Sequence, residues 1–129
     1  MFALLICLAA GIKPIITSSS DRKLEIAQAL GPPGVVGAIN YRTYPNWEQE
    51  ARQMTGGRGV DIVVDNVGPT AIKQTLSSLA RRGLISFVGF LAGFKMDEQP
   101  DVLGPLLVKN AVLRFVISVP AQLLTTAAF

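Results

Sequence analysis

Val60-Asp-Ile-Val-Val-Asp65, followed by Asn66-Val67-Gly68-Pro69, is the stretch that decides the fold. A run this rich in β-branched apolar residues is typical of a strand in a parallel sheet, where helices cover both faces. Pro69 suits the first turn of a helix, because the N–H group that proline lacks has no partner there. The stretch therefore predicts a buried strand, a turn and then a helix.

The same alternation extends in both directions along the chain. Apolar runs predict further strands at residues 12–17, 35–40, 84–88 and 112–119. Helical periodicity and stop signals predict helices at residues 1–10, 22–30, 46–54, 70–80, 102–109 and 120–129. Strict alternation with short connections predicts an α/β fold, a parallel sheet with helices on both faces.

The first helix is apolar nearly all round, so we expect it to be buried. Pro14 lies in the predicted strand at 12–17 and has no N–H group to donate, so we expect this strand to be irregular or to lie at the edge of the sheet.

Composition limits the classes of protein that fit. The chain has 129 residues, enough for a single domain over 1–129, and half of them are apolar, which excludes disorder. The net charge of +3 is dispersed, so we expect no nucleic-acid partner. The apolar start is too short to span a bilayer and lacks basic residues, so we expect neither a membrane partner nor a signal peptide.

Cysteine and histidine usage narrows the chemistry further. The single cysteine, Cys7, excludes a disulfide framework and favours a reducing, cytoplasmic location. The chain contains no histidine. We therefore expect no ordinary zinc site, no bound metal and no catalytic triad.

Ligands in such sheets bind beyond the carboxyl ends of the strands. The strand that ends at Thr17 continues into Ser18-Ser19-Ser20, where dinucleotide-binding domains selective for NAD carry an acidic residue. Lys23 follows one turn into the next helix. Hydroxyl groups and a lysine at a helix N-terminus predict a site for the 2′-phosphate of NADPH. The alternative is that the serines only cap the helix.

Three further segments are rich in glycine or polar residues and are therefore candidates for loops that bind a ligand. Gly56-Gly57-Arg58-Gly59 precedes a strand, so we interpret it as a tight turn and not as a phosphate cradle. Asn66-Val67-Gly68 and residues 89–93 follow strands, where glycine would let a ligand approach the backbone. Ordinary turns explain these two segments equally well.

These residues also resemble a known family. Residues 15–30 (IITSSSDRKLEIAQAL), 39–42 (INYR), 55–68 (TGGRGVDIVVDNVG) and 85–93 (ISFVGFLAG) are similar to the nucleotide-binding domain of medium-chain dehydrogenase/reductases. The zinc-independent quinone oxidoreductase branch, with its alcohol dehydrogenase-like members, is the nearest in character. The resemblance implies a Rossmann-like domain that prefers NADPH to NADH. It implies contacts to the 2′-phosphate region from Ser18, Ser19, Lys23 and Tyr41, to the adenine-side ribose from Asn66 and Gly68, and to the nicotinamide half from Phe90 and Leu91.

The chain also departs from the family pattern. Family members have a strand and a glycine-rich turn before the first helix, and this sequence starts at the helix, so we expect a truncated domain. Without that central strand, the strands at 12–17 and 60–65 either leave a gap or pair directly, which predicts rearrangement, strand exchange or self-association. The resemblance also implies a homodimer through the strand at 112–119, with the gap as an alternative interface. Phe115 and Pro120 would obstruct the nicotinamide end.

Three functions follow from these expectations. The first is a truncated NADPH-dependent quinone oxidoreductase-like or alcohol dehydrogenase-like protein that binds NADPH weakly and transfers no hydride alone. The second is a repurposed domain for a cyclisation or isomerisation of a small-molecule ligand, with Tyr41, Asp65, Asn66 and Lys23 as candidate acid–base or hydrogen-bonding groups. The third is a non-catalytic dimerising partner.

Overall fold

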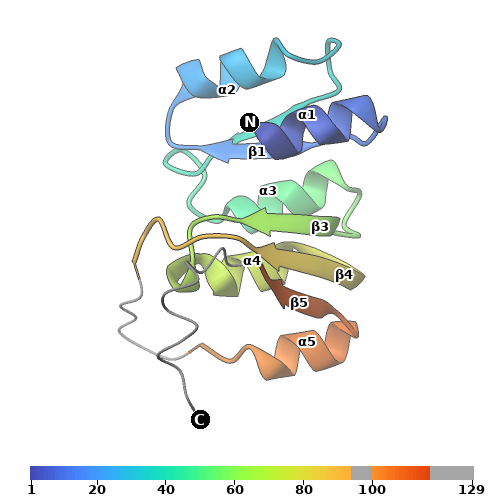
Figure 1. Ribbon diagram of the computed structural model, residues 1–129, viewed down its shortest axis with the longest axis vertical. Coiled ribbons are helices and arrows are strands. Elements are labelled where there is room, and N and C mark those ends of the chain that lie inside the picture. Colours follow the sequence, from blue (N-terminus) through green and yellow to red (C-terminus); the bar gives the residue numbers. More distant parts are fainter. Residues whose placement is uncertain (94–99, 117–129) are drawn as a thin grey trace, which may run out of the picture.

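The computed structural model describes residues 1–93 and 100–116 (Figure 1). Helices and strands alternate along this part of the chain, as predicted. Their bounds are α1 Phe2–Ala9, β1 Ile15–Ser18, α2 Asp21–Gln28, β2 Gly37–Asn40, α3 Trp47–Met54, β3 Val60–Asp65, η1 Pro69–Ala71, α4 Ile72–Ser78, β4 Leu79–Phe87, α5 Leu103–Lys109 and β5 Val112–Phe115. The predicted helix at 120–129 and the end of the predicted strand at 112–119 lie outside the described residues.

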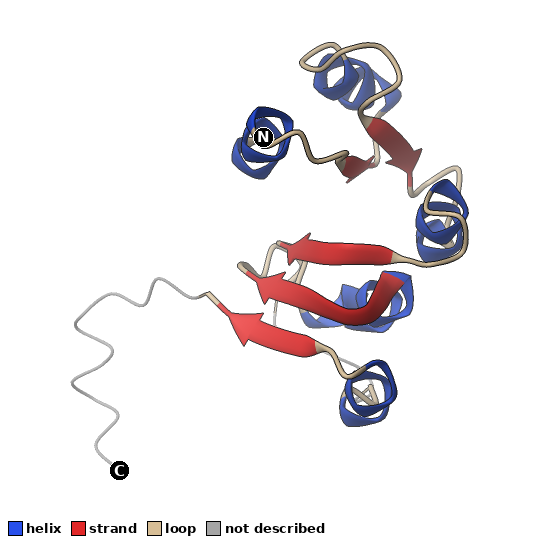
Figure 2. Cartoon of the chain, turned by 90° about the vertical axis from the view of Figure 1, so that its right-hand side faces the viewer, coloured by secondary structure: helices blue, strands red, loops and turns tan. Residues whose placement is uncertain are grey.

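The described strands form two parallel sheets. One has the order β1-β2 and the other has the order β3-β4-β5, and every pair within them is parallel. The two sheets stand apart in both views (Figures 1 and 2). Direct pairing of β1 with β3, one of the two expected outcomes, is therefore not formed, and the described strands show the gap.

Each sheet has its own apolar core. Leu4 of α1, Ala27 of α2 and Val36 pack together beside β1 and β2. A larger cluster lies between the three-stranded sheet and α4 and consists of Ile72, Leu76, Leu79, Ile85 and Phe87. The two halves meet through α3, which contacts both β2 and α4.

The expected burial of α1 and β3 is wrong. Only Leu4 of α1 is buried, because one face of this helix packs on the first core while Phe2, Leu5 and Ile6 are exposed. Ile62 of β3 is 59% exposed, because β3 is an edge strand and this face of it is not covered by described residues. Pro14 precedes β1, and its carbonyl oxygen accepts a hydrogen bond from the Gly37 amide.

The predicted helix at 70–80 is also too long. The chain forms a 3-10 turn with Pro69 in its first turn, then α4, and enters β4 at Leu79. Leu79 pairs with Val60, while the next paired residues are Leu84 and Ile62, so β4 carries a bulge. Arg82 lies within the bulge with a φ of 61°. The last residues of the predicted helix, Leu79 and Ala80, therefore belong to the strand, because the sheet outweighs local helix propensity.

Candidate functional site

The carboxyl end of β1 forms an open hollow together with α2. Ser18 ends β1 and Lys23 lies in the first turn of α2. Both line the hollow, whose remaining lining is Met1, Ile16, Thr17, Ile26 and Ala27. Among the described residues of that lining, Lys23 has the only charged side chain, so this part of the hollow favours an anion.

The serines beside this hollow do not cap α2 through their side chains. Ser20 occupies the N-cap position without a side-chain capping bond, and its own amide donates to the Ser18 hydroxyl at 3.3 Å. The interpretation of the serines as helix caps is therefore not supported. Ser19 is half-buried beside them.

Tyr41 follows β2 and lies beside Ser18 through its backbone. Its amide donates to the Ser18 carbonyl at 3.0 Å, but its side chain is exposed and is not part of the lining of the hollow. The nearby carboxylate, Asp21, accepts a hydrogen bond from the Asn40 side chain at 2.7 Å. Asp21 lines a different hollow, between α2 and the end of β2.

A second group of candidate residues lies at the ends of β3 and β4. Three backbone hydrogen bonds join the two segments: Val88 N to Asp65 O, Leu91 N to Asn66 O and Ala92 N to Val67 O, at 2.8–3.0 Å. The Phe90 ring stacks edge-on against Phe87, with centroids 5.3 Å apart, and Leu91 is 85% exposed. The structure thus brings Asn66, Gly68, Phe90 and Leu91 together.

Gly68 is required by the packing between these two segments. It has a φ of 105°, and a β-carbon there would lie 3.2 Å from the Phe90 α-carbon. The glycine therefore lets the backbones of the two loops approach each other, in addition to the two interpretations that the sequence left open, approach by a ligand or an ordinary turn.

Asp65 is not free to act as a general acid or base. It is 4% exposed, and its carboxylate accepts hydrogen bonds from the amides of Val67 and Gly68 and from the Thr75 hydroxyl. Sequence reasoning missed Thr75. The pattern Asp-Asn-Val-Gly after a strand is a signal for a carboxylate that binds the following amides, but nothing local indicates the threonine ten positions later.

The candidate residues at the end of β1 and those at the ends of β3 and β4 lie at the same edge of the molecule. The arrowheads of β1, β3 and β4 point the same way in Figure 1, so Ser18 and Lys23 share this edge with the segments that follow β3 and β4. Tyr41 follows β2, which runs parallel to β1. This is the edge where parallel sheets bind ligands.

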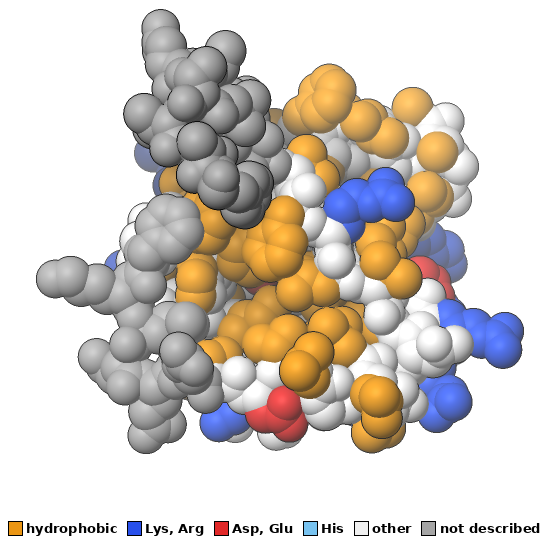
Figure 3. Space-filling model, turned by 60° about the horizontal axis from the view of Figure 1, so that its bottom comes forward, with side chains coloured by type: hydrophobic (Ala, Val, Ile, Leu, Met, Phe, Trp, Pro, Cys, Tyr) orange, Lys and Arg blue, Asp and Glu red, His pale blue; other side chains and the backbone are white. Residues whose placement is uncertain are grey.

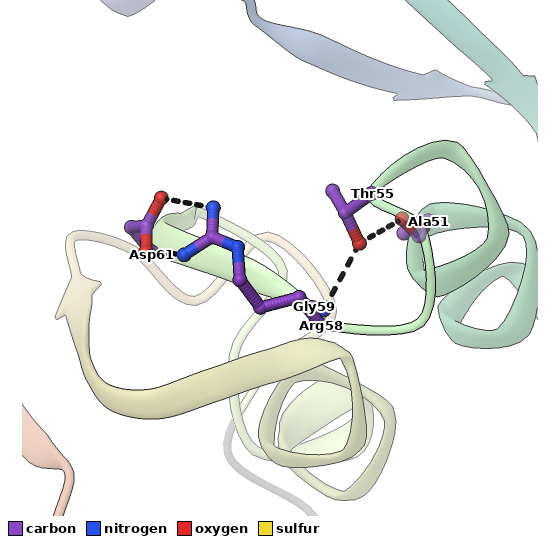
Figure 4. Close-up of polar contacts among 5 residues, drawn as sticks. All are labelled: Ala51, Thr55, Arg58, Gly59 and Asp61. Atoms are coloured by element: carbon purple, nitrogen blue, oxygen red, sulfur yellow. Dashed lines mark hydrogen bonds and ion pairs between the residues drawn. The ribbon is translucent and has the colours of Figure 1, made fainter.

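The glycine-rich segment at 56–59 is a turn at the opposite end of β3, as predicted (Figure 4). Thr55 closes it: its hydroxyl donates to the Ala51 and Arg52 carbonyls and accepts from the Gly59 amide at 3.0 Å. Arg58 makes a bidentate ion pair with Asp61. Hydrogen bonding to Arg58 lowers the pKa of the Asp61 carboxyl.

In residues 1–93 and 100–116, no cluster of three or more His, Cys, Asp or Glu side chains is placed to hold a metal ion. With no histidine and a single cysteine in the sequence, the donor set does not fit an ordinary zinc site. Within the same residues, none of the helices has the length and apolar character needed to cross a membrane.

Parallel strands that alternate with helices define a Rossmann-like α/β protein. Residues 1–122 match the family model described as zinc-binding dehydrogenase. The chain belongs to this family, within the medium-chain dehydrogenase/reductase superfamily.

Relatives and solved structures agree with this assignment. The chain is 40% identical, over 114 residues, to a zinc-type alcohol dehydrogenase-like protein of Schizosaccharomyces pombe, covering 88% of this chain and 32% of that protein. It superposes on an NAD-dependent alcohol dehydrogenase with a TM-score of 0.76 and 28% identity, covering 95% of this chain and 34% of the other. It also superposes on the Escherichia coli quinone oxidoreductase complexed with NADPH, with a TM-score of 0.73 and 29% identity, covering 88% and 33%. The chain thus spans about a third of the length of these relatives.

Proposed function

We propose that this chain binds the adenosine half of NADPH as the nucleotide-binding part of an oxidoreductase. The observation that carries the proposal is the hollow at the end of β1, whose described lining contains Lys23 as its one charged side chain and includes no carboxylate. A lysine there would pair with a 2′-phosphate, and the missing carboxylate removes the group that selects NAD. Of the similar structures, the quinone oxidoreductase was crystallised with NADPH and the alcohol dehydrogenase is NAD-dependent, so the preference for NADPH rests on the residues of the hollow.

Each candidate residue has a role in this proposal. Ser18, Ser19 and Lys23 contact the 2′-phosphate, and Tyr41 lies near the same phosphate. Asn66 and Gly68 lie beside the adenine-side ribose. Phe90 and Leu91 border the nicotinamide half. The grouping of these residues at one edge of the molecule supports these roles.

We further propose that the 129 residues bind NADPH weakly and transfer no hydride by themselves. The chain spans about a third of its relatives, and their full length would supply further contacts to cofactor and substrate. The activity proposed for such a full-length protein is NADPH-dependent reduction of a quinone-type or carbonyl acceptor, in the cytoplasm. A non-redox cyclase or isomerase has less support, because Asp65 is fully hydrogen-bonded and both hollows described above are open.

A homodimer is proposed through β5. Within residues 1–93 and 100–116 this strand pairs with β4 on one side only, and its Phe115 is 60% exposed even though the ring packs edge-on against Phe87. Figure 3 shows hydrophobic side chains gathered on the face that includes the bottom of Figure 1, where α5 and β5 lie. Exposed apolar side chains of these two elements are Leu103, Leu107, Val108 and Val112. The gap between the two sheets is the alternative interface.

The cofactor proposal is tested with Lys23→Met. Titration calorimetry of NADPH and NADH against the full chain should show tighter binding of NADPH. We expect the substitution to weaken NADPH binding by about ten- to a hundredfold, since a hydrogen bond to a charged group contributes roughly 1.5–3 kcal/mol, and to leave NADH binding unchanged. Lys73→Met, at an exposed position on α4, is the matched control. Equal affinity for the two nucleotides, or equal weakening of both by Lys23→Met, would contradict the proposal.

A further inference from the structure

The carboxylate of Asp65 holds together the loop that follows β3. Asp65 ends β3, and its Oδ1 atom accepts hydrogen bonds from the amides of Val67 at 2.9 Å and Gly68 at 3.1 Å. Its Oδ2 atom accepts a hydrogen bond from the Thr75 hydroxyl at 2.7 Å. Both oxygens are thus engaged, and Thr75 itself is only 2% exposed.

This arrangement links helix α4 to the loop. Thr75 lies on α4, so its hydroxyl fixes the orientation of the carboxylate relative to that helix. The carboxylate in turn turns the two amides inward. Asn66, between the strand end and these amides, is left exposed at the edge of the molecule.

The link continues into the segment after β4. The carbonyl oxygens of Asn66 and Val67 accept hydrogen bonds from the amides of Leu91 and Ala92, both at 3.0 Å. The loop at 66–68 is therefore clamped between the carboxylate on one side and the neighbouring loop on the other. A change at Asp65 should reach both loops.

We propose that Asp65 and Thr75 form a positioning pair that sets the backbone of both loops for the nucleotide. The pair acts through residues 66–68 and 89–92 and does not itself touch the ligand. The inference rests on the proposed binding of NADPH for its functional consequence, but its structural part can be tested without any ligand.

The first test is amide hydrogen exchange of the full chain with Thr75→Val and Thr75→Ser. Valine has nearly the same shape as threonine but lacks the hydroxyl, and serine retains it. We expect Thr75→Val to speed exchange at Val67 and Gly68 about tenfold, with a smaller effect at Leu91 and Ala92, and to leave Ile85 unchanged. Thr75→Ser should restore slow exchange. If exchange became faster at all amides including Ile85, or did not change at Val67 and Gly68, the proposal that Asp65 and Thr75 position the loops would be wrong.

Asp65→Asn and Asp65→Ala provide an independent check. The amide oxygen of asparagine still accepts from the two backbone amides, and its nitrogen donates to the Thr75 hydroxyl, so Asp65→Asn should exchange much like the wild type. Asp65→Ala removes every acceptor and should release both loops. If Asp65→Ala fails to fold, the threonine variants still decide the question.

NADPH affinity separates this inference from the function on which it rests. If the wild type binds NADPH, we expect Thr75→Val to weaken binding about tenfold and Thr75→Ser to restore it. Loss of slow exchange without loss of affinity would overturn the positioning role. If the wild type does not bind NADPH, the proposed function fails, and the exchange data alone then support or overturn the pair.

Discussion

At the scale of single residues, Gly59 shows how closely the turn before β3 approaches the next strand. It has a φ of 91°, and a β-carbon there would lie 2.7 Å from the Ser78 carbonyl oxygen and 2.8 Å from the Ala80 nitrogen. These are backbone atoms, which cannot move aside as a flexible side chain can. We predict that Gly59→Ala lowers the free energy of unfolding, measured by urea denaturation, by about 3 kcal/mol or more, from backbone strain and overpacking together.

Gly56→Ala is the matched control for this prediction. Gly56 lies in the same turn with a φ of 63°, but a β-carbon there would meet no atom within 4 Å. Only the backbone strain remains, so we expect a loss of about 1–2 kcal/mol. Equal losses for the two variants would show that the close approach to Ser78 and Ala80 contributes nothing.

Single residues also show why part of the site could be predicted. Asn66 follows β3 directly and Lys23 lies in the first turn of the helix after β1, so their place at the carboxyl edge could be deduced from the order of elements alone. Thr75 could not be found in this way, because its role depends on where α4 lies relative to Asp65. Asp65 was identified as a candidate, but its burial and full hydrogen bonding depend on tertiary contacts.

At the scale of elements, Lys109 fixes α5 against the end of α4. Its ammonium group donates to the carbonyl oxygens of Leu76, Ser77 and Leu79, which end the helix or follow it. Burial, together with the nearby Arg52, lowers the pKa of Lys109, so part of the gain from these bonds is offset by desolvation. We predict that Lys109→Met lowers the free energy of unfolding by about 1–2 kcal/mol.

Chemical denaturation checks this prediction, with Lys73→Met as a control on the exposed side of α4. The control should stay within about 0.5 kcal/mol of the wild type, as surface substitutions usually do. A gain in stability for Lys109→Met would mean that the cost of burying the ammonium group exceeds the value of its three hydrogen bonds.

The sequence predicted an element well where characteristic residues bound it on both sides. It predicted an element poorly where pairing between strands determines its end. β3 was predicted to the residue, because Gly59 and Asn66 bound an apolar run. The end of α4 was missed, because Leu79 and Ala80 suit a helix but belong to β4, in which Leu79 pairs with Val60 ahead of the bulge. The exposure of α1 was missed because burial depends on what covers the outer face of a helix, which no local pattern records.

At the scale of the whole molecule, the two sheets should differ in stability. The β1-β2 sheet has two strands of four residues each, and two-stranded sheets are marginal without support. Its core contains three buried residues, against five in the cluster beside β3, β4 and β5. Among the described residues, a hydrogen bond links the two halves: Trp47 Nε1 of α3 donates to Gln74 Oε1 of α4 at 3.0 Å.

This asymmetry predicts that the β1-β2 half opens before the rest of the molecule. Native-state hydrogen exchange should give a lower opening free energy for the amide of Ile39 than for that of Ile85, because the second lies in the larger core. Leu4→Ala removes a buried side chain from the smaller core only, at a cost of about 2–5 kcal/mol for such a substitution. It should therefore speed exchange at Ile39 and leave Ile85 unchanged. Equal acceleration at both amides would show that α3 couples the halves into one cooperative unit in spite of the separated sheets.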